Sequence, residues 1–181
     1  MKVTETPLQG LLVIEPTVFK DSRGFFYESF QHQRYHEHSI PAMVQDNISR
    51  SEKNTLRGLH YQLPHAQGKL VSVIRGSVWD VAVDIRKSSP TFGQWFGTVL
   101  NDEEHKQLYI PPGFAHGFCV ISDDADILFK CTAYYSPTTE QGIIWNDPAL
   151  KITWPTATPV LSDKDKKYHT LQEIADERLF A

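Results

Sequence analysis

The stretch GKLVSVIRGSVWDVAVDIR, residues 68–86, decides the fold class of this chain. Odd-numbered positions from 79 to 85 are all hydrophobic, whereas the even-numbered positions include Asp80 and Asp84. This period of two predicts a β-strand over Val78–Ile85. The two aspartates face either solvent or a wet barrel interior, and solvent is the commoner environment for a carboxylate. Gly76 and Ser77 predict a hairpin turn in front of the strand.

Short apolar runs recur on both sides of this stretch, bounded by Gly, Pro, Asn and Asp. Examples are GLLVIEP (10–16), FGQWFGTVL (92–100), KQLYIPPG (106–113) and ADILFKCTAYY (125–135). Many short strands with such boundaries predict an all-β sandwich or barrel. The sequence contains no repeat, low-complexity tract or linker, so we expect a single domain over residues 1–181.

Few stretches of the sequence have the residue pattern of a helix. In TLQEIADERLF (170–180), Thr170 and Glu173 form a capping box, and an apolar stripe includes Leu171 and Ile174. We therefore expect a C-terminal helix. A second short helix is predicted over QHQRYHEHS (31–39), with its histidines in solvent.

Net charge, the two cysteines and the N-terminal apolar run argue against several classes of protein. A net charge of −4 provides no broad basic field for nucleic acid, although a local basic pocket for a small anion remains open. Cys119 and Cys131 lie in apolar runs, which predicts buried free thiols in a reducing compartment. The N-terminal apolar run, Leu11–Ile14, is shorter than a signal peptide core or a membrane span. We therefore expect a cytoplasmic protein without membrane attachment.

The stretch IPPGFAHGF (110–118) contains the pattern P-x-G-x-x-H, ending at His116. It resembles the second signature of the cupin family, whose fold is a double-stranded β-helix or jelly roll. Metal-binding cupins carry H-x-H and a following Glu in their first signature. Here TLRGLHYQ (55–62) has His60 but Gln62 at the second position. Since first-row metals want about three or four imidazole or carboxylate ligands, we expect no metal, which leaves His60 free to act as a base.

A wider set of motifs is more specific than the cupin signatures. The following stretches occur in this order: DSRGFFYESF, QDNISRS, LRGLHYQ, KLVSVIRGSVWDVAVDIRKSSPTFGQW, PPGFAHGF, AYYSP and IIWNDP. Together they resemble the dTDP-4-dehydrorhamnose 3,5-epimerase family, the metal-independent cupins of the dTDP-L-rhamnose pathway. The resemblance covers the chain from about residue 3 to residue 166.

The resemblance implies a reaction on dTDP-4-keto-6-deoxy-D-glucose that needs no cofactor and gives dTDP-4-dehydro-L-rhamnose. The ketone acidifies the protons on C3 and C5. A base removes such a proton to form an enolate, and an acid returns a proton to the opposite face. The site therefore needs a base of near-neutral pKa, a group for the enolate oxygen and an acid across the ring.

His60 fits the base, because an unperturbed imidazole titrates near 6.5. The resemblance makes Asp165, in LSDKD, the carboxylate that orients His60, and it places Lys69 beside the ketone. Judged from the residues alone, Asp165 would be a solvated loop carboxylate and Lys69 a surface lysine at the start of a strand.

The resemblance also assigns the nucleotide ligands. Arg57 matches an arginine that contacts the diphosphate, and Tyr135 matches a tyrosine that stacks on thymine. Arg23 and Glu28 match residues that the partner subunit contributes on an exchanged N-terminal strand, which implies a homodimer. The other matching ligand positions are Gln45, Asp46, Asn47, His116, Glu140 and Lys164.

One position departs from the family pattern. Phe129 stands six residues before Tyr135, where the family has the tyrosine that donates the proton. Period-two counting still directs Phe129 to the face of Tyr135. Three explanations stay open: Tyr134 or Tyr135 supplies the acid, water or another group protonates the enolate, or only one carbon is epimerised. We favour changed acid chemistry over lost activity.

Other functions remain as alternatives. They are a single-site C3 or C5 epimerase, a non-catalytic cupin that binds a sugar nucleotide, and a metal-dependent dioxygenase. The combination of His60, Lys69 and Asp165 argues against mere binding, because binding requires no base. Gln62 argues against the dioxygenase.

Overall fold

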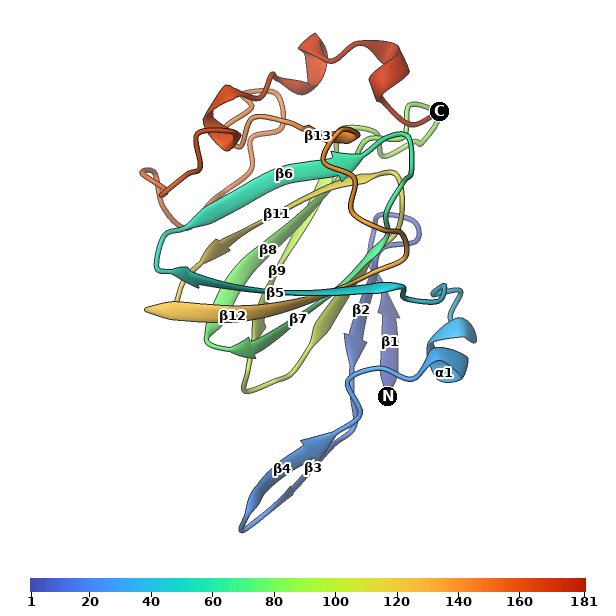
Figure 1. The fold of residues 1–181 in the computed structure, drawn as a ribbon, viewed down its shortest axis with the longest axis vertical. Helices are drawn as coiled ribbons and strands as arrows, with labels where there is room; N and C mark the ends of the chain where they lie inside the picture. Colours follow the sequence, from blue (N-terminus) through green and yellow to red (C-terminus); the bar gives the residue numbers. More distant parts are fainter.

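The structure, a computed structural model, describes residues 1–181 and consists of two β-sheets that face each other, with a two-stranded arm beside them (Figure 1). The all-β cupin-type fold is therefore confirmed. Every strand pair is antiparallel. The six-stranded sheet has the order β1 (Lys2–Glu5), β2 (Leu12–Glu15), β10 (Gln107–Ile110), β7 (Lys69–Arg75), β12 (Asp124–Cys131), β5 (Gln45–Glu52). The five-stranded sheet has the order β13 (Glu140–Gly142), β6 (Leu56–Gln62), β11 (Phe114–Val120), β8 (Ser77–Asp84), β9 (Trp95–Asn101).

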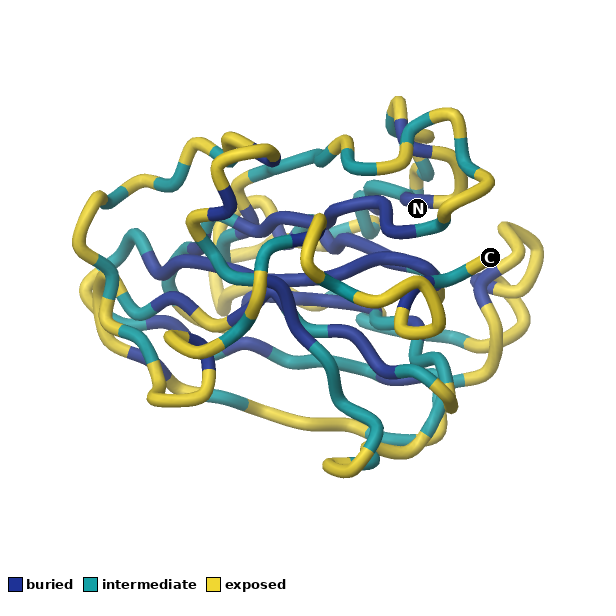
Figure 2. Tube along the Cα trace, turned by 90° about the horizontal axis from the view of Figure 1, so that it is seen from above, coloured by how far each residue is buried: buried dark blue, intermediate teal, exposed yellow.

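The hydrophobic core lies between the two sheets, where Figure 2 shows most of the buried backbone. On β8, Val78 and Ala82 face this core, while Val81 and Val83 pack on the other face against a second cluster. Leu171 and Leu179 cover that second cluster. The predicted strand is therefore confirmed, and it is buried on both faces.

Burial of β8 on both faces contradicts the expectation of solvent around Asp80 and Asp84, which are fully buried. Arg86 and the hydroxyls of Ser89 and Thr91 donate hydrogen bonds to Asp84, and Asp80 contacts His116. A buried carboxylate is tolerated only when such partners compensate its lost hydration.

The turn at Gly76 does not form the predicted hairpin. It connects β7 in one sheet with β8 in the other, so the chain crosses the core instead of reversing within a sheet. Gly76 has a φ of +79°, and a Cβ there would lie 2.1 Å from the carbonyl oxygen of Asp124. Only glycine fits this crossing.

The predicted C-terminal helix is also wrong. Residues 170–180 form two separate 3₁₀ turns, η2 (Leu171–Glu173) and η3 (Asp176–Arg178), although the capping box of Thr170 and Glu173 is present. The chain extends between the turns because Leu171 and Leu179 both enter the core cluster, and Tyr61 donates to the carbonyl of Arg178. Tertiary packing overrides the local helical pattern here.

The remaining expectations about local structure are confirmed. The short helix is α1 (His32–His36), in which Tyr35 is buried and the histidines are exposed. Cys119 and Cys131 are buried free cysteines. None of the helices has the length and hydrophobicity needed to cross a membrane.

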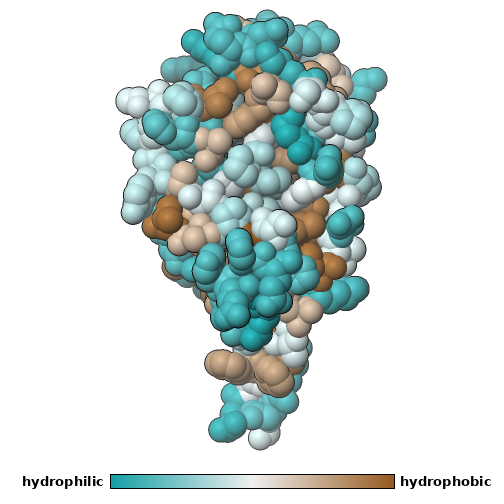
Figure 3. Space-filling model, turned by 90° about the vertical axis from the view of Figure 1, so that its right-hand side faces the viewer, coloured by the Kyte–Doolittle hydropathy of each residue, from teal (hydrophilic) through white to brown (hydrophobic).

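The arm consists of β3 (Val18–Asp21) and β4 (Gly24–Tyr27). It projects from the body of the molecule, and hydrophobic side chains lie on its surface (Figures 1 and 3). Phe19 and Phe26 pair across the two strands and are 63% and 70% exposed. Phe25 and Tyr27 instead pack around His105 of the body, with ring centroids 4.5 and 4.7 Å away. The arm therefore has an anchored face and a free face.

Candidate active site

A cavity of about 310 Å³ opens between the sheets. Its walls come from β6 and β11 on one side and from β5, β7 and β12 on the other. The predicted site residues that line it are Asn47, Arg57, His60, Lys69, His116, Phe129, Tyr135, Glu140 and Lys164. Residues far apart in the sequence thus meet in one hollow.

His60 is held by Asp165 across 105 sequence positions. Its Nε2 lies 2.5 Å from Oδ1 of Asp165, and Ser162 donates a hydrogen bond to the other carboxylate oxygen. Burial opposes the ionisation of Asp165, but the hydrogen bonds from His60 and Ser162 hold its pKa below the usual value. Asp165 is therefore a carboxylate that orients His60. The other ring nitrogen, Nδ1, lies 4.0 Å from Oε1 of Glu140 and makes no hydrogen bond within the chain.

Close approach of two strands sets the position of His60. A Cβ on Gly58 of β6 would lie 2.5 Å from the Cα of Gly117 on β11, and Gly58 has a φ of +130°. The register shifts between His116 and Phe118, so His60 pairs directly with His116. This irregular contact places the two imidazoles in the same cavity wall.

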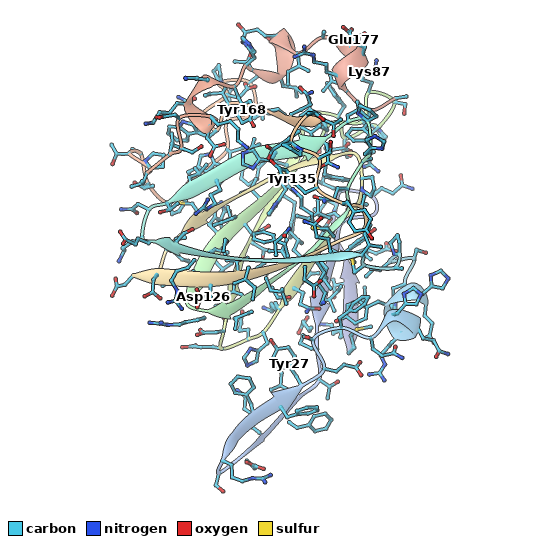
Figure 4. The ribbon with its side chains drawn as sticks, in the orientation of Figure 1. Tyr27, Lys87, Asp126, Tyr135, Tyr168 and Glu177 are labelled. Atoms are coloured by element: carbon cyan, nitrogen blue, oxygen red, sulfur yellow. The ribbon has the colours of Figure 1, made fainter.

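Tyr168, which sequence reasoning missed, covers His60 from outside the cavity. Its ring stands edge-on to the imidazole at 5.7 Å, and a Cβ on Gly142 would lie 2.4 Å from it. In Figure 4, Tyr168 lies above β6 and Tyr135 below it. Only the packing of the C-terminal segment on β6 brings Tyr168 to this place, so no local sequence signal could reveal it.

His116 has its own buried carboxylate. Its Nε2 lies 3.0 Å from both oxygens of Asp80, and both side chains are buried. Burial lowers the pKa of His116, although Asp80 opposes this shift. Asp80 was also missed as a site residue. Its place on the Ala82 face of β8 was the one available signal, because that face turns toward the core between the two sheets.

Lys69 begins β7 and lines the cavity. Its ammonium makes no hydrogen bond or ion pair with the protein, unlike that of Lys164. Burial lowers the pKa of Lys69, and the negative charge of Glu140 opposes this shift. Lys69 therefore presents an amino group without a protein partner, available to a ligand oxygen.

A polar network lines one end of the cavity. The hydroxyl of Tyr135 donates to Oε2 of Glu140 at 3.0 Å, and Lys164 reaches the same oxygen at 2.5 Å. Burial opposes the ionisation of Glu140, but Lys164 and His60 hold its pKa below the usual value. Gln45 lies at the edge, where its side-chain oxygen accepts from the backbone of Tyr135. The ring of Tyr135 remains half exposed, so its face is accessible.

Gln62 has a structural role that the sequence did not reveal. Its amide donates to the carbonyls of His65 and Tyr134, and its oxygen accepts from the backbone of Ser136. It therefore fixes the 134–136 loop over the cavity. The structure contains no group of three or more His, Cys, Asp or Glu side chains arranged around one point as metal ligands.

Phe129 points into the cavity from β12. Its ring stands edge-on to His116 at 6.1 Å and lies 6.0 Å from Phe118. Of the two tyrosines considered as a substitute acid, Tyr134 is 73% exposed and lies outside the cavity. The hydroxyl of Tyr135 is bound to Glu140, on the side of His60.

Three predicted ligands do not reach this cavity within the chain. Arg23 lies on the exposed arm with Asp21, and Glu28 pairs with Arg34. Asp46 pairs with Lys130 at 2.7 Å on the outer surface of the sheet.

Comparisons with known proteins agree with one another. The family model described as dTDP-4-dehydrorhamnose 3,5-epimerase matches residues 5–173. The dTDP-4-dehydrorhamnose 3,5-epimerase of Shigella flexneri is 54% identical over 91% of this chain and 93% of that protein. The Legionella pneumophila dTDP-6-deoxy-D-glucose-3,5-epimerase, solved in complex with dTDP-4-keto-L-rhamnose, superposes with a TM-score of 0.96 at 52% identity, covering 99% of this chain and 97% of that one.

A more distant structure has a narrower stated activity. ChmJ from Streptomyces bikiniensis, a 3'-monoepimerase in complex with dTDP-quinovose, gives a TM-score of 0.87 at 33% identity. The match covers 92% of this chain and 86% of that one.

Proposed function

This chain belongs to the dTDP-4-dehydrorhamnose 3,5-epimerase family and is an isomerase; on that premise we propose that its cavity epimerises dTDP-4-keto-6-deoxy-D-glucose through an enolate, with His60 as the base. One observation carries the proposal. The His60–Asp165 pair stands in one cavity wall, and the uncommitted ammonium of Lys69 stands in the other.

The proton transfer follows from this arrangement. His60 removes a proton from a carbon beside the ketone, and Asp165 stabilises the imidazolium that forms. Lys69 donates a hydrogen bond to the enolate oxygen, where the negative charge develops. A cation without a protein partner suits this task, because it is not neutralised in advance.

The nucleotide binds at the open end of the cavity. Arg57 uses Nε to bind Ser51, which leaves its terminal nitrogens for the diphosphate. The half-exposed ring of Tyr135 supplies a stacking face for thymine. Lys164 and Glu140 lie beside it and contribute polar contacts to the ligand.

The working molecule in this proposal is a homodimer that exchanges its arms. The support is that Arg23 lies far from its own cavity on an arm whose outer face exposes Phe19 and Phe26. Mixing and refolding Arg23→Ala with His60→Ala chains tests this. Mixed dimers hold one intact site, so roughly a quarter of wild-type activity returns. If no activity returns, each cavity does not use its partner's arm.

Solvent exchange tests the function itself. The chain is incubated with dTDP-4-keto-6-deoxy-D-glucose in D₂O, and deuterium at C3 and C5 is followed by NMR. We expect incorporation at both carbons together with inversion. Bound dTDP without exchange at either carbon would make the chain a binding module.

A single-site epimerase is the second candidate, and Phe129 favours it. Phe129 lacks the hydroxyl that a tyrosine would place on the wall facing His60. A 3'-monoepimerase shares the fold. Exchange at one carbon only would establish this narrower activity.

A further inference from the structure

The wall opposite His60 contains few groups that carry a transferable proton. Inversion requires the proton to return from the face opposite the base. That wall consists of β5, β7 and β12, and the side chains that it presents to the cavity are Asn47, Ser49, Lys69, Phe129 and Cys131.

Only one of these side chains fits the task of an acid. Phe129 has no acidic proton, and a carboxamide such as Asn47 does not act as an acid. A serine hydroxyl is a far weaker acid than a thiol, whose unperturbed pKa is about 8.5. Lys69 already holds the enolate oxygen, so Cys131 remains.

The strand register places Cys131 well for this step. It follows Phe129 by two positions on β12, so both side chains project into the cavity from the same face. Cys131 is also the direct neighbour of Lys69 on β7, whereas Phe129 pairs with Val71. The thiol therefore lies beside the cation that binds the ketone oxygen. Its one polar contact is a weak hydrogen bond from Asn47 at 3.9 Å.

We propose that the thiol of Cys131 is the acid that returns a proton to the enolate, in place of the hydroxyl that Phe129 lacks. This inference rests on the proposed function. His60 takes the proton as the C–H bond breaks, and the enolate carbon then forms a new C–H bond with the proton of Cys131. The resulting thiolate lies beside the ammonium of Lys69. Solvent carries the proton from the imidazolium to the thiolate, which restores both groups.

The protonation state of the Cys131 thiol agrees with its role as the acid. Burial raises the pKa of Cys131, and Lys69 opposes the shift. The group is therefore a neutral thiol at neutral pH and carries the proton that it must give. Once the thiolate forms, the neighbouring cation stabilises it.

The test separates proton removal from inversion in Cys131→Ala, with Cys119→Ala as the matched control. Cys119 is a buried free cysteine outside the cavity, and its thiol makes one weak hydrogen bond, to the carbonyl of Val120. We expect Cys131→Ala to keep deuterium exchange with retention of configuration, because His60 is intact, and to lose inversion by about 10²–10⁴-fold. Cys119→Ala should invert at the wild-type rate. Inversion by Cys131→Ala at the rate of Cys119→Ala would overturn the inference while wild-type exchange still supports the proposed function.

Two further variants exclude a packing defect. Cys131→Ser preserves the size of the side chain, and we expect it to lose inversion as Cys131→Ala does. The double variant Phe129→Tyr with Cys131→Ala should regain at least tenfold in inversion, because a phenol again faces the enolate. Full inversion by Cys131→Ser, or no recovery in the double variant, would show that the thiol is not the acid. Absence of exchange in the wild-type enzyme would instead refute the proposed function.

Discussion

The two walls of the cavity are built by different means. In the wall of β6 and β11, a buried carboxylate holds each imidazole, with Asp165 2.5 Å from His60 and Asp80 3.0 Å from His116. In the wall of β5, β7 and β12, Lys69 has no such partner. Charge-assisted hydrogen bonds are roughly twice as strong as neutral ones and hold a side chain in a defined orientation. The first wall therefore holds His60, the proposed base, in a fixed orientation, while the departure at Phe129 lies in the second wall, where we propose that the acid chemistry has changed.

Asp165→Asn should have the largest effect among the variants that sharpen this comparison. The amide cannot stabilise the imidazolium of His60, so kcat should fall by about 10²–10⁴-fold while dTDP binding persists. Steady-state kinetics and calorimetry with dTDP measure the two effects. Asp163→Asn, at an exposed neighbouring carboxylate that pairs only with Lys166, is the control. Equal kcat in both variants would show that Asp165 does not support the base.

Lys69→Met should have the next largest effect. Removal of the cation leaves the enolate oxygen without its donor, and we expect kcat to fall by about 10²–10³-fold. Exchange at C3 and C5 should slow in parallel, because the enolate itself is destabilised. Lys53→Met removes an exposed lysine paired with Asp123 and should leave both rates unchanged. A slower inversion with unchanged exchange would move Lys69 from the enolate oxygen to the acid step.

Phe129→Tyr should change activity less than the two variants above. It tests whether the wall of β5, β7 and β12 tolerates a different side chain at this position. The added hydroxyl would lie on the cavity side, and we expect up to about a tenfold change in inversion at one carbon relative to the other. NMR of C3 and C5 in the same sample measures the ratio. Unchanged rate and ratio would mean that the phenylalanine is neutral for catalysis.

Acid should weaken the contact between Asp165 and His60 and so loosen the segment that carries Asp165. The pKa of Asp165 is depressed in the folded state, so its stabilisation is complete above the unfolded pKa near 3.9 and is lost as pH falls through the lower folded value. Hydrogen exchange between pH 6 and pH 3 should therefore show residues 162–168 losing protection before β12. Asp165→Asn should remove this difference. Earlier loss of protection in β12 would contradict it.

The alternation of hydrophobic and polar residues predicted where strands occur, but it did not predict whether each face of a strand is buried or exposed. Alternation around Val81 identified β8, because side-chain period depends only on the strand itself. It did not show that a second sheet and the C-terminal segment bury both faces, and so Asp80 and Asp84 were misplaced. The same limit explains Gly76, whose turn depends on the position of the other sheet.

Local sequence pattern predicted even less of the active site, because its contacts join residues that are far apart in the sequence. His60 was visible in a short motif, and the family resemblance showed the departure at Phe129. The contact between His60 and Asp165 spans 105 positions, and only the family resemblance indicated it. The second pair, His116 with Asp80, was missed because it depends on packing between β11 and β8.

The most direct test of the account is the His60→Ala variant in D₂O with dTDP-4-keto-6-deoxy-D-glucose. NMR measures deuterium at C3 and C5, and calorimetry measures dTDP binding on the same preparation. If His60 is the base, the variant should lose exchange at least a hundredfold at every carbon that exchanges in the wild type and should retain its affinity for dTDP. Exchange that survives at the wild-type rate would show that His60 is not the base.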